Sequence, residues 1–252
     1  MDLGLRDRVF VVTGASRGLG RATATLLVAE GARVVVSSRS RDHLDPVVDA
    51  LGRDNATPVV ADNADPDTPR AVVAAAFERF GRLDGALISV GGPPAGPIAE
   101  KTPGEWREYV DSIFLGGLRL TITVAKSLQA GGSIALVLST SVKQPIANLG
   151  MSNALRPGLA MAAKTLADEL GPRGIRINGL LPGRVETERV QELDAASDDP
   201  RETRRRHLQT IPLRRYGRPE EFAAMAAFLL SPAAAYITGA MVPVDGGISR
   251  GL

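Results

Sequence analysis

The segment MSNALRPG, residues 151–158, holds two side chains that could do chemistry. Ser152 and Arg156 stand four positions apart, so on a helix they would share one face. A hydroxyl beside a permanent cation can polarise a carbonyl group, but serine is a poor general acid and arginine does not release its proton. Ser139, which ends an expected strand 13 positions before Ser152, is the third candidate for a catalytic role.

Pro157 directly follows this pair and limits how the segment can fold. Proline has no N–H group, disfavours helical geometry in the residue before it, and costs about 3 kcal/mol in a helix interior. We therefore expect a helix that begins near Pro157 or is kinked there. Either outcome would change the position of Ser152.

A second candidate site is the glycine-rich stretch VVTGASRGLG, in which Gly14, Gly18 and Gly20 lie between an expected strand and an expected helix. Glycine permits a tight turn, close approach of a phosphate and close packing of helix on strand. The N–H groups at the start of the helix could then bind a pyrophosphate. The spacing is not that of a P-loop, and plain turn formation is the alternative explanation.

The second expected strand ends at Ser38 and Arg39 without an acidic residue. An acid at this place would bind a ribose 2′-hydroxyl and repel a 2′-phosphate, whereas Arg39 would pair with that phosphate. Arg17 in the glycine turn adds a second positive charge. The pattern favours NADP(H) over NAD(H), although both arginines could also be ordinary surface residues.

The elements that position these residues alternate between short β-branched runs and alanine-rich helical stretches. Strands that are apolar throughout, separated by helices, predict an α/β doubly wound parallel sheet covered on both faces. The expected strands are 8–12, 33–38, 58–61, 83–89, 133–139, 175–181 and 240–245, and the expected helices include 18–31, 41–51, 67–80, 103–130 and 218–231.

Length and composition agree with one domain covering residues 1–252. The formal net charge is only +2, which argues against nucleic acid as a partner, and no apolar run reaches membrane-spanning length. There are no cysteines and two histidines, so disulfides and thiolate metal sites are excluded and we expect no metal. The first residues lack the layout of a signal peptide, which favours a cytoplasmic protein.

Three motifs carry a resemblance to a known family: TGASRGLG at 13–20, INGLLPGRVET at 177–187 and YITGAMVPVDGG at 236–247. Across nearly the whole chain the sequence resembles the short-chain dehydrogenase/reductase family, in its 3-oxoacyl-acyl-carrier-protein reductase-like branch. The resemblance implies a seven-stranded Rossmann sheet and a homotetramer or homodimer. It also implies an NADP(H)-dependent oxidoreductase acting on a small carbonyl or alcohol, with an acyl thioester as one candidate.

The family pattern also implies which residues contact the cofactor. It places adenine beside the residues after the third strand, and the nicotinamide and phosphates beside the Pro-Gly loop near residue 183. The implied cofactor-binding residues are Gly14, Ser16, Arg17, Gly18, Leu19, Gly20, Ser38, Arg39, Asp62, Asn63, Val90, Gly91, Gly92, Arg156, Pro182, Gly183, Val185 and Thr187.

The catalytic positions depart from the family pattern. Ser89-Val90-Gly91-Gly92 stands in place of Asn-Asn-Ala-Gly, Ile113 replaces an asparagine, and Ser152 and Arg156 replace the tyrosine and lysine. Of the four expected catalytic residues only the serine, Ser139, remains. Two functions stay open: a reductase in which Ser139 and Ser152 polarise the carbonyl while a water molecule delivers the proton, and an NADP(H)-binding sensor or scaffold without turnover. Lys143 is a further candidate proton donor, although a solvated loop lysine is the favoured interpretation.

The charged stretch 186–215 stands where the family has its substrate lid. Its basic run Arg204–Arg206 could attract an anionic substrate or an acidic carrier protein. A solvated helix face interleaved with acidic residues is the favoured interpretation.

Overall fold

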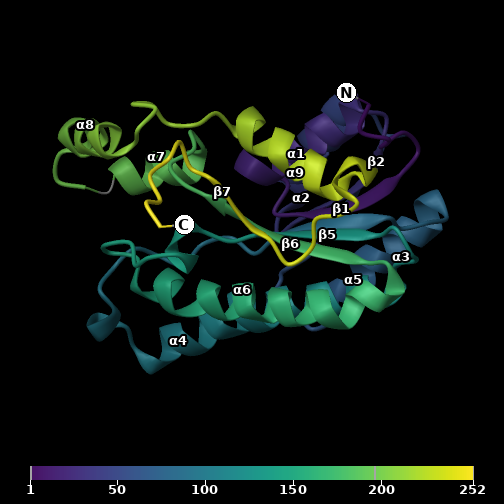
Figure 1. The fold of residues 1–252 in the computed structure, drawn as a ribbon, viewed down its shortest axis with the longest axis horizontal. Coiled ribbons are helices and arrows are strands. Elements are labelled where there is room, and N and C mark those ends of the chain that lie inside the picture. The colour runs from purple at the N-terminus through teal and green to yellow at the C-terminus, as the bar shows by residue number, and fades with distance from the viewer. Residues whose placement is uncertain (1, 196, 252) are drawn as a thin grey trace.

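A computed structural model describes residues 2–195 and 197–251, and its centre is one sheet of seven parallel strands (Figure 1). The spatial order β3-β2-β1-β4-β5-β6-β7 reverses direction between β1 and β4, where a doubly wound sheet opens a crevice for a ligand. The predicted fold class is confirmed. The strands are Val9–Thr13 (β1), Arg33–Ser38 (β2), Ala56–Val60 (β3), Gly85–Ser89 (β4), Ser133–Val137 (β5), Arg176–Pro182 (β6) and Met241–Val244 (β7).

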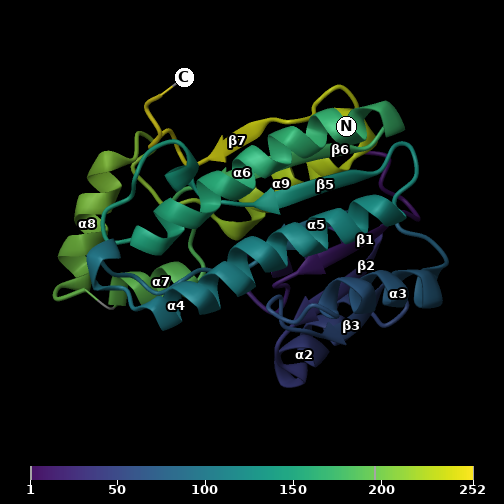
Figure 2. The same cartoon turned by 90° about the horizontal axis from the view of Figure 1, so that it is seen from below.

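Two layers of helices cover the sheet, as the uniformly apolar strands require. Successive residues of β1 point to opposite faces: Val9 and Val11 pack with α3, α5 and α6, whereas Phe10 and Val12 pack with α1, α2 and α9. Figures 1 and 2 show these layers from two directions. The helices are Gly18–Ala29 (α1), Arg41–Leu51 (α2), Thr68–Phe80 (α3), Pro103–Tyr109 (α4), Gly116–Ser127 (α5), Gly150–Leu170 (α6), Glu188–Ala195 (α7), Pro200–Thr210 (α8) and Pro219–Leu230 (α9).

The single helix expected over 103–130 is interrupted. A π-helical turn at Val110–Leu115 joins α4 to α5, and α5 ends at Ser127. The sequence pattern missed the interruption because a π-turn inserts one residue without breaking the apolar face. The stretch expected to form the lid contains α7 and α8, which lie together at one end of the molecule (Figure 1).

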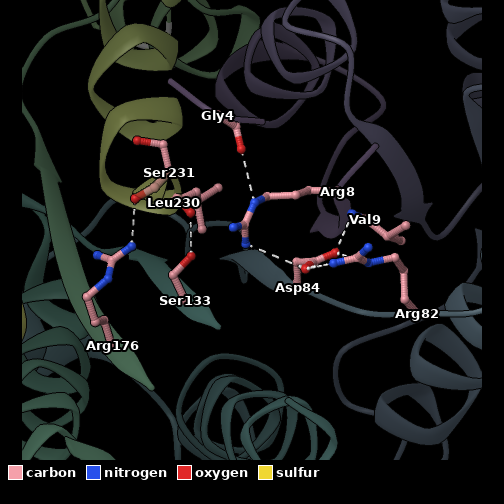
Figure 3. Close-up of polar contacts among 9 residues, drawn as sticks. All are labelled: Gly4, Arg8, Val9, Arg82, Asp84, Ser133, Arg176, Leu230 and Ser231. Carbon is pink, nitrogen blue, oxygen red and sulfur yellow. Dashed lines mark hydrogen bonds and ion pairs between the residues drawn. The ribbon is translucent and has the colours of Figure 1, made fainter. Parts of the chain in front are cut away.

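Polar contacts tie together the starts of several strands (Figure 3), whereas the glycine turn follows the other end of β1. Asp84, just before β4, accepts the backbone N–H of Val9 at 2.9 Å and two hydrogen bonds from Arg82 at 2.7 and 2.8 Å. Arg176, the first residue of β6, is 8% exposed and donates to the carbonyls of Leu229 and Ser231 at 2.8 and 2.9 Å. These contacts fix strand β6 to the end of α9.

In the described part of the chain no helix combines the length and apolar character needed to cross a membrane. Within residues 2–195 and 197–251 no three histidine, aspartate or glutamate side chains gather as metal ligands would.

Candidate functional site

The glycine turn after β1 has a backbone that only glycine adopts readily. Gly14 has φ +62° and Gly18 has φ +55°, in the left-handed region. A Cβ on Gly20 would lie 2.4 Å from the carbonyl oxygen of Gly14, so the turn packs directly on the first turn of α1. No acidic residue occupies the first turn of α1, whose unpaired N–H groups suit a pyrophosphate. The residues present therefore fit the phosphates of a dinucleotide.

The Pro-Gly loop after β6 lies against this turn. The N–H of Gly183 donates to the carbonyl of Val244 at 3.0 Å, and Val185 is buried. The methyl carbon of Thr187 lies 3.3 Å from where a Cβ on Gly18 would stand. The structure thus brings together two predicted cofactor segments that are far apart in the sequence.

The end of β2 presents a cation without a carboxylate partner. Arg39 is exposed and forms no ion pair with any residue that the structure describes. The neighbouring Ser38 donates to the carbonyl of Ser40 at 3.1 Å, which holds the strand end in place. Arg39 is therefore available to an external phosphate.

Arg17 has a different environment from Arg39. Its guanidinium pairs with Glu192 of α7 at 2.5 Å, and this hydrogen bond raises the pKa of Arg17 and lowers that of Glu192. Arg21 of α1 also faces α7, 3.7 Å from Glu188. The glycine turn and α1 are thus each linked to α7 by an ion pair, and a role for Arg17 on a 2′-phosphate stays a prediction.

The predicted cofactor residues next to β4 also converge. The amide of Asn63 donates to the carbonyl of Ser89 at 3.3 Å, and a Cβ on Gly116 would stand 2.3 Å from the carbonyl oxygen of Asn63. Asp62 instead accepts the N–H of Ala64 at 2.9 Å, which stabilises its own loop. Gly91 has φ +73° and nothing within 4 Å of its absent Cβ, so the space beside it is open.

The two candidate serines contact a third serine rather than each other. Ser139 accepts the backbone N–H of Ser141 at 3.1 Å, which leaves the proton of its own hydroxyl free to donate. Ser152 is 5% exposed, and its Oγ lies 3.4 Å from the Oγ of Ser141. Ser141 thus joins the segment after β5 to the first turn of α6.

Arg156 lies beneath the ends of β4 and β5. It is 7% exposed and donates to the carbonyl of Val137 at 3.0 Å and to that of Gly91. Burial, and to a lesser degree the positive charge of Arg189, lowers the pKa of Arg156 to about 10. At neutral pH the guanidinium is still charged.

Comparisons with known proteins agree with this geometry. The family model described as "Enoyl-(Acyl carrier protein) reductase" matches residues 14–249. The chain belongs to the short-chain dehydrogenase/reductase family. The 3-oxoacyl-[acyl-carrier-protein] reductase of a Synechocystis strain is 35% identical over 251 residues, covering 97% of this chain and 98% of that protein. Levodione reductase of Leifsonia aquatica is 36% identical over 255 residues, covering 96% and 94%.

A solved structure gives the same assignment. A short-chain dehydrogenase/reductase from Brucella melitensis, described as a glucose/ribitol dehydrogenase, superimposes with a TM-score of 0.92 at 31% identity and full coverage of both chains. The prediction of an oxidoreductase of the short-chain dehydrogenase/reductase family is thereby confirmed.

Ile113 stands where the short-chain dehydrogenase/reductase pattern is expected to hold an asparagine, and the side chains around it are also apolar. Ile113 lies in the π-helical turn and is 1% exposed, packed in the core on the α5 and α6 side of the sheet. No hydroxyl, amide or charge therefore comes from this position, and its correspondence to the family's asparagine stays a prediction.

Of the two outcomes expected for Pro157, a helix that begins near it is wrong, and a kink at Pro157 stays a prediction. Helix α6 begins at Gly150, seven residues earlier, and runs to Leu170 with Pro157 inside it. Close packing holds this first turn, because a Cβ on Gly150 would lie 2.7 Å from the backbone nitrogen of Ile98. Ser152 and Arg156 consequently share the buried face of one helix.

The sequence reasoning missed Ser141, Arg189 and a polar cluster that ties α7 and α8 to the segments on either side of them. Arg184 pairs with Asp194 at 2.9 Å, and Tyr216 donates to the same carboxylate at 2.9 Å. Burial, then the bond to Asp194, raises the pKa of Tyr216 to about 12, so this phenol is a poor proton donor. His207 lies 2.9 Å from Arg184 and 3.1 Å from the Tyr216 hydroxyl. Nothing in the spacing of these four residues indicates that they meet.

The basic run on α8 is largely neutralised. Arg205 and Arg206 both bond to Glu202 of the same helix, at 2.7 and 3.0 Å, and Arg204 pairs with Glu186. Arg204 also stacks over the ring of Tyr216, 4.3 Å from its centroid. This arrangement agrees with a solvated helix face interleaved with acidic residues.

Proposed function

We propose that the protein is an NADP(H)-dependent oxidoreductase that interconverts a carbonyl group and the matching alcohol. The observation that carries the proposal is the end of β2, where Arg39 is exposed and has no ion-pair partner among the described residues. A 2′-phosphate would supply that partner, because a guanidinium binds phosphate through two parallel hydrogen bonds.

The residues of the glycine turn and the Pro-Gly loop would hold the rest of the cofactor. Gly14 and Gly18 keep the turn tight, and Thr187 packs against it from the other side. When bound, NADPH supplies a hydride to the carbonyl carbon and becomes NADP⁺, while one proton must reach the carbonyl oxygen. This chain's own residues have to orient the carbonyl and direct that proton.

Ser139 is the residue best placed to orient the carbonyl. One of its two lone pairs accepts the N–H of Ser141, which fixes the oxygen, and its own O–H can still donate to a carbonyl oxygen. Ser152 acts through Ser141, and Arg156 keeps a positive charge near the developing negative charge on oxygen. Because a serine does not readily give up its proton, a water molecule supplies the proton that completes the alcohol.

A second candidate function is an NADP(H)-binding sensor or scaffold without turnover. Its support is the loss of the proton relay: Ile113 is buried among apolar side chains, and Ser152 and Arg156 replace the tyrosine and lysine. A positioned general acid supplies roughly 10²–10⁴-fold in rate, so an enzyme that relies on water is expected to be slow. We further propose a cytoplasmic homotetramer or homodimer.

The test combines binding with turnover. NADPH binding is measured directly, and NADPH oxidation is followed by absorbance against ketones, aldehydes, oxo acids and acyl thioesters. Oxidation that depends on a carbonyl compound supports the enzyme. Tight NADPH binding with no oxidation by any compound in the panel supports the sensor or scaffold, and no binding of either nicotinamide cofactor contradicts both.

A further inference from the structure

Arg156 is a buried cation without an opposite charge beside it. It is 7% exposed and forms no ion pair with any residue in the described part of the chain. Its two protein contacts are the neutral carbonyls of Val137 and Gly91. A guanidinium has five N–H donors, so three remain for other partners. Charged side chains are rarely buried unless something compensates the charge.

A second guanidinium reaches the same loop from the lid. Arg189, at the start of α7, donates to the carbonyl of Pro93 at 2.6 Å, and its Nε lies 3.6 Å from where a Cβ on Gly92 would stand. Arg156 holds Gly91 from α6 while Arg189 holds Pro93 from α7. Two positive charges therefore contact the short segment 91–93, which follows β4.

A neighbouring carboxylate offsets this pair of charges only in part. Glu192 lies 4.0 Å from Arg189, at the outer limit of an ion pair, and it binds Arg17 more closely, at 2.5 Å. The effect of Arg189 on Arg156 is repulsion, which contributes to the lowered pKa of Arg156. An anion bound between the two guanidiniums would remove that repulsion.

The phosphates of the cofactor are expected at a different strand end from those that Arg156 contacts. The glycine turn follows β1, whereas Arg156 bonds to the loop after β4 and to the end of β5. Neighbouring strands are about 4.8 Å apart, so these carbonyls lie one and two strand spacings, about 5 and 10 Å, from the end of β1. The reduced nicotinamide and its ribose carry no charge. The remaining ligand at this position is the substrate.

We propose that Arg156 and Arg189 bind a carboxylate group of the substrate, which makes the substrate an oxo acid with a free carboxylate near the reacting carbonyl. The inference rests on the proposed oxidoreductase function and names its substrate class. A planar guanidinium matches the two oxygens of a carboxylate, and the open space beside Gly91 gives that group room.

The test compares each oxo acid with its own methyl ester, which has the same carbonyl but no charge. With NADPH as cofactor, kcat/KM for 2-oxo and 3-oxo acids is expected to exceed that for the esters by roughly 10–100-fold, the worth of one or two charge-assisted hydrogen bonds. Arg189→Gln should lower the acid-to-ester ratio several-fold, mainly by raising KM for the acid, while Arg156 retains part of the preference. Arg189 is partly exposed on the lid, so this variant is expected to fold.

A matched control removes one positive charge from the lid outside the site. Arg205→Gln loses a surface contact with Glu202 only, and its acid-to-ester ratio should equal that of the wild type. A ratio that falls equally in both variants would show that general lid charge sets the preference, which contradicts the site. Arg156→Lys, which keeps the charge but not the planar fork, should lower the ratio in part.

The experiments distinguish an error in the proposed carboxylate site from an error in the proposed oxidoreductase function. Esters or acyl thioesters reduced as fast as oxo acids would overturn the carboxylate site while leaving the oxidoreductase intact. If no compound oxidises NADPH, calorimetric titration of 2-hydroxy and 3-hydroxy acids into protein saturated with NADP⁺ decides the matter. Binding that is lost in Arg189→Gln supports the site, and no binding of these acids overturns it.

Discussion

Replacing Gly20 with alanine perturbs the glycine turn at its tightest contact. The new Cβ would stand 2.4 Å from the carbonyl oxygen of Gly14 and 3.1 Å from the Cα of Ala15. Real Cβ atoms essentially never come within 3.0 Å of another heavy atom, so the turn or α1 must shift by roughly 0.6 Å. Both neighbouring atoms belong to the backbone and cannot rotate away.

That shift has a cost in stability and in cofactor binding. Overpacking of this kind costs about 1–3 kcal/mol. In a chain of this length each kcal/mol lowers the melting temperature by roughly 2–4 °C, so Gly20→Ala should melt roughly 2–12 °C below the wild type. Because the same backbone would receive the pyrophosphate, the Kd for NADPH should rise by at least about tenfold, or about 1.4 kcal/mol.

Gly171 provides a matched control for the glycine-to-alanine change. It has φ −52° and ψ −47°, and a Cβ there would meet nothing within 4 Å. Gly171→Ala should therefore melt at or slightly above the wild type, because alanine reduces the entropy of the unfolded chain, and it should bind NADPH normally. Thermal unfolding followed by circular dichroism, with a fluorescence titration of NADPH, measures both. A Gly20→Ala protein indistinguishable from Gly171→Ala would refute the close packing of the turn.

Three further variants test other parts of the structure. Arg176→Met leaves carbonyls at the end of α9 without donors and should lower the free energy of unfolding by about 1–3 kcal/mol in urea titrations, whereas an unchanged midpoint would contradict that anchoring role. If turnover is found, Ser139→Ala should lower kcat by roughly 10²-fold, the worth of one lost donor to a developing oxyanion, and an unchanged rate would remove Ser139 from the site. Burial, then the charge of Arg184, lowers the pKa of His207. Just below pH ~6.5, the ordinary pKa of histidine, the folded state therefore binds fewer protons than the unfolded chain. Stability should therefore fall as pH drops below about 6.5. His207→Gln, whose side chain cannot become charged, should lose less stability over the same pH range in thermal unfolding. Equal losses in both proteins would contradict a lowered pKa for His207.

The sequence predicted the features that depend on local pattern. Each buried strand is a short apolar run, and the glycine spacing after β1 marked the turn because few other residues accept the backbone angles of Gly14 and Gly18. Ile113 was identified as an apolar substitution, and the structure places it in the core.

Features that depend on contacts between distant segments were missed. Helix α6 begins at Gly150, which packs closely on Ile98, a residue far away in the sequence, so the pattern around Pro157 did not show where the helix starts. Arg17 meets Glu192, 175 positions away, and no spacing rule predicts such a pair. Arg189 reached the candidate site for the same reason, since its role depends on how α7 folds back over the loop after β4.

The most direct measurement of the central claim is the affinity of the wild type and of Arg39→Glu for NADPH and for NADH, by equilibrium titration. Arg41→Glu is the control, because it changes the net charge equally but its arginine already pairs with Asp45 at 3.6 Å. We expect Arg39→Glu to weaken NADPH binding by roughly 10–100-fold while NADH binding changes little, and Arg41→Glu to leave the preference intact. Equal weakening of both cofactors in Arg39→Glu, or a wild type that prefers NADH, would contradict a 2′-phosphate site at the end of β2.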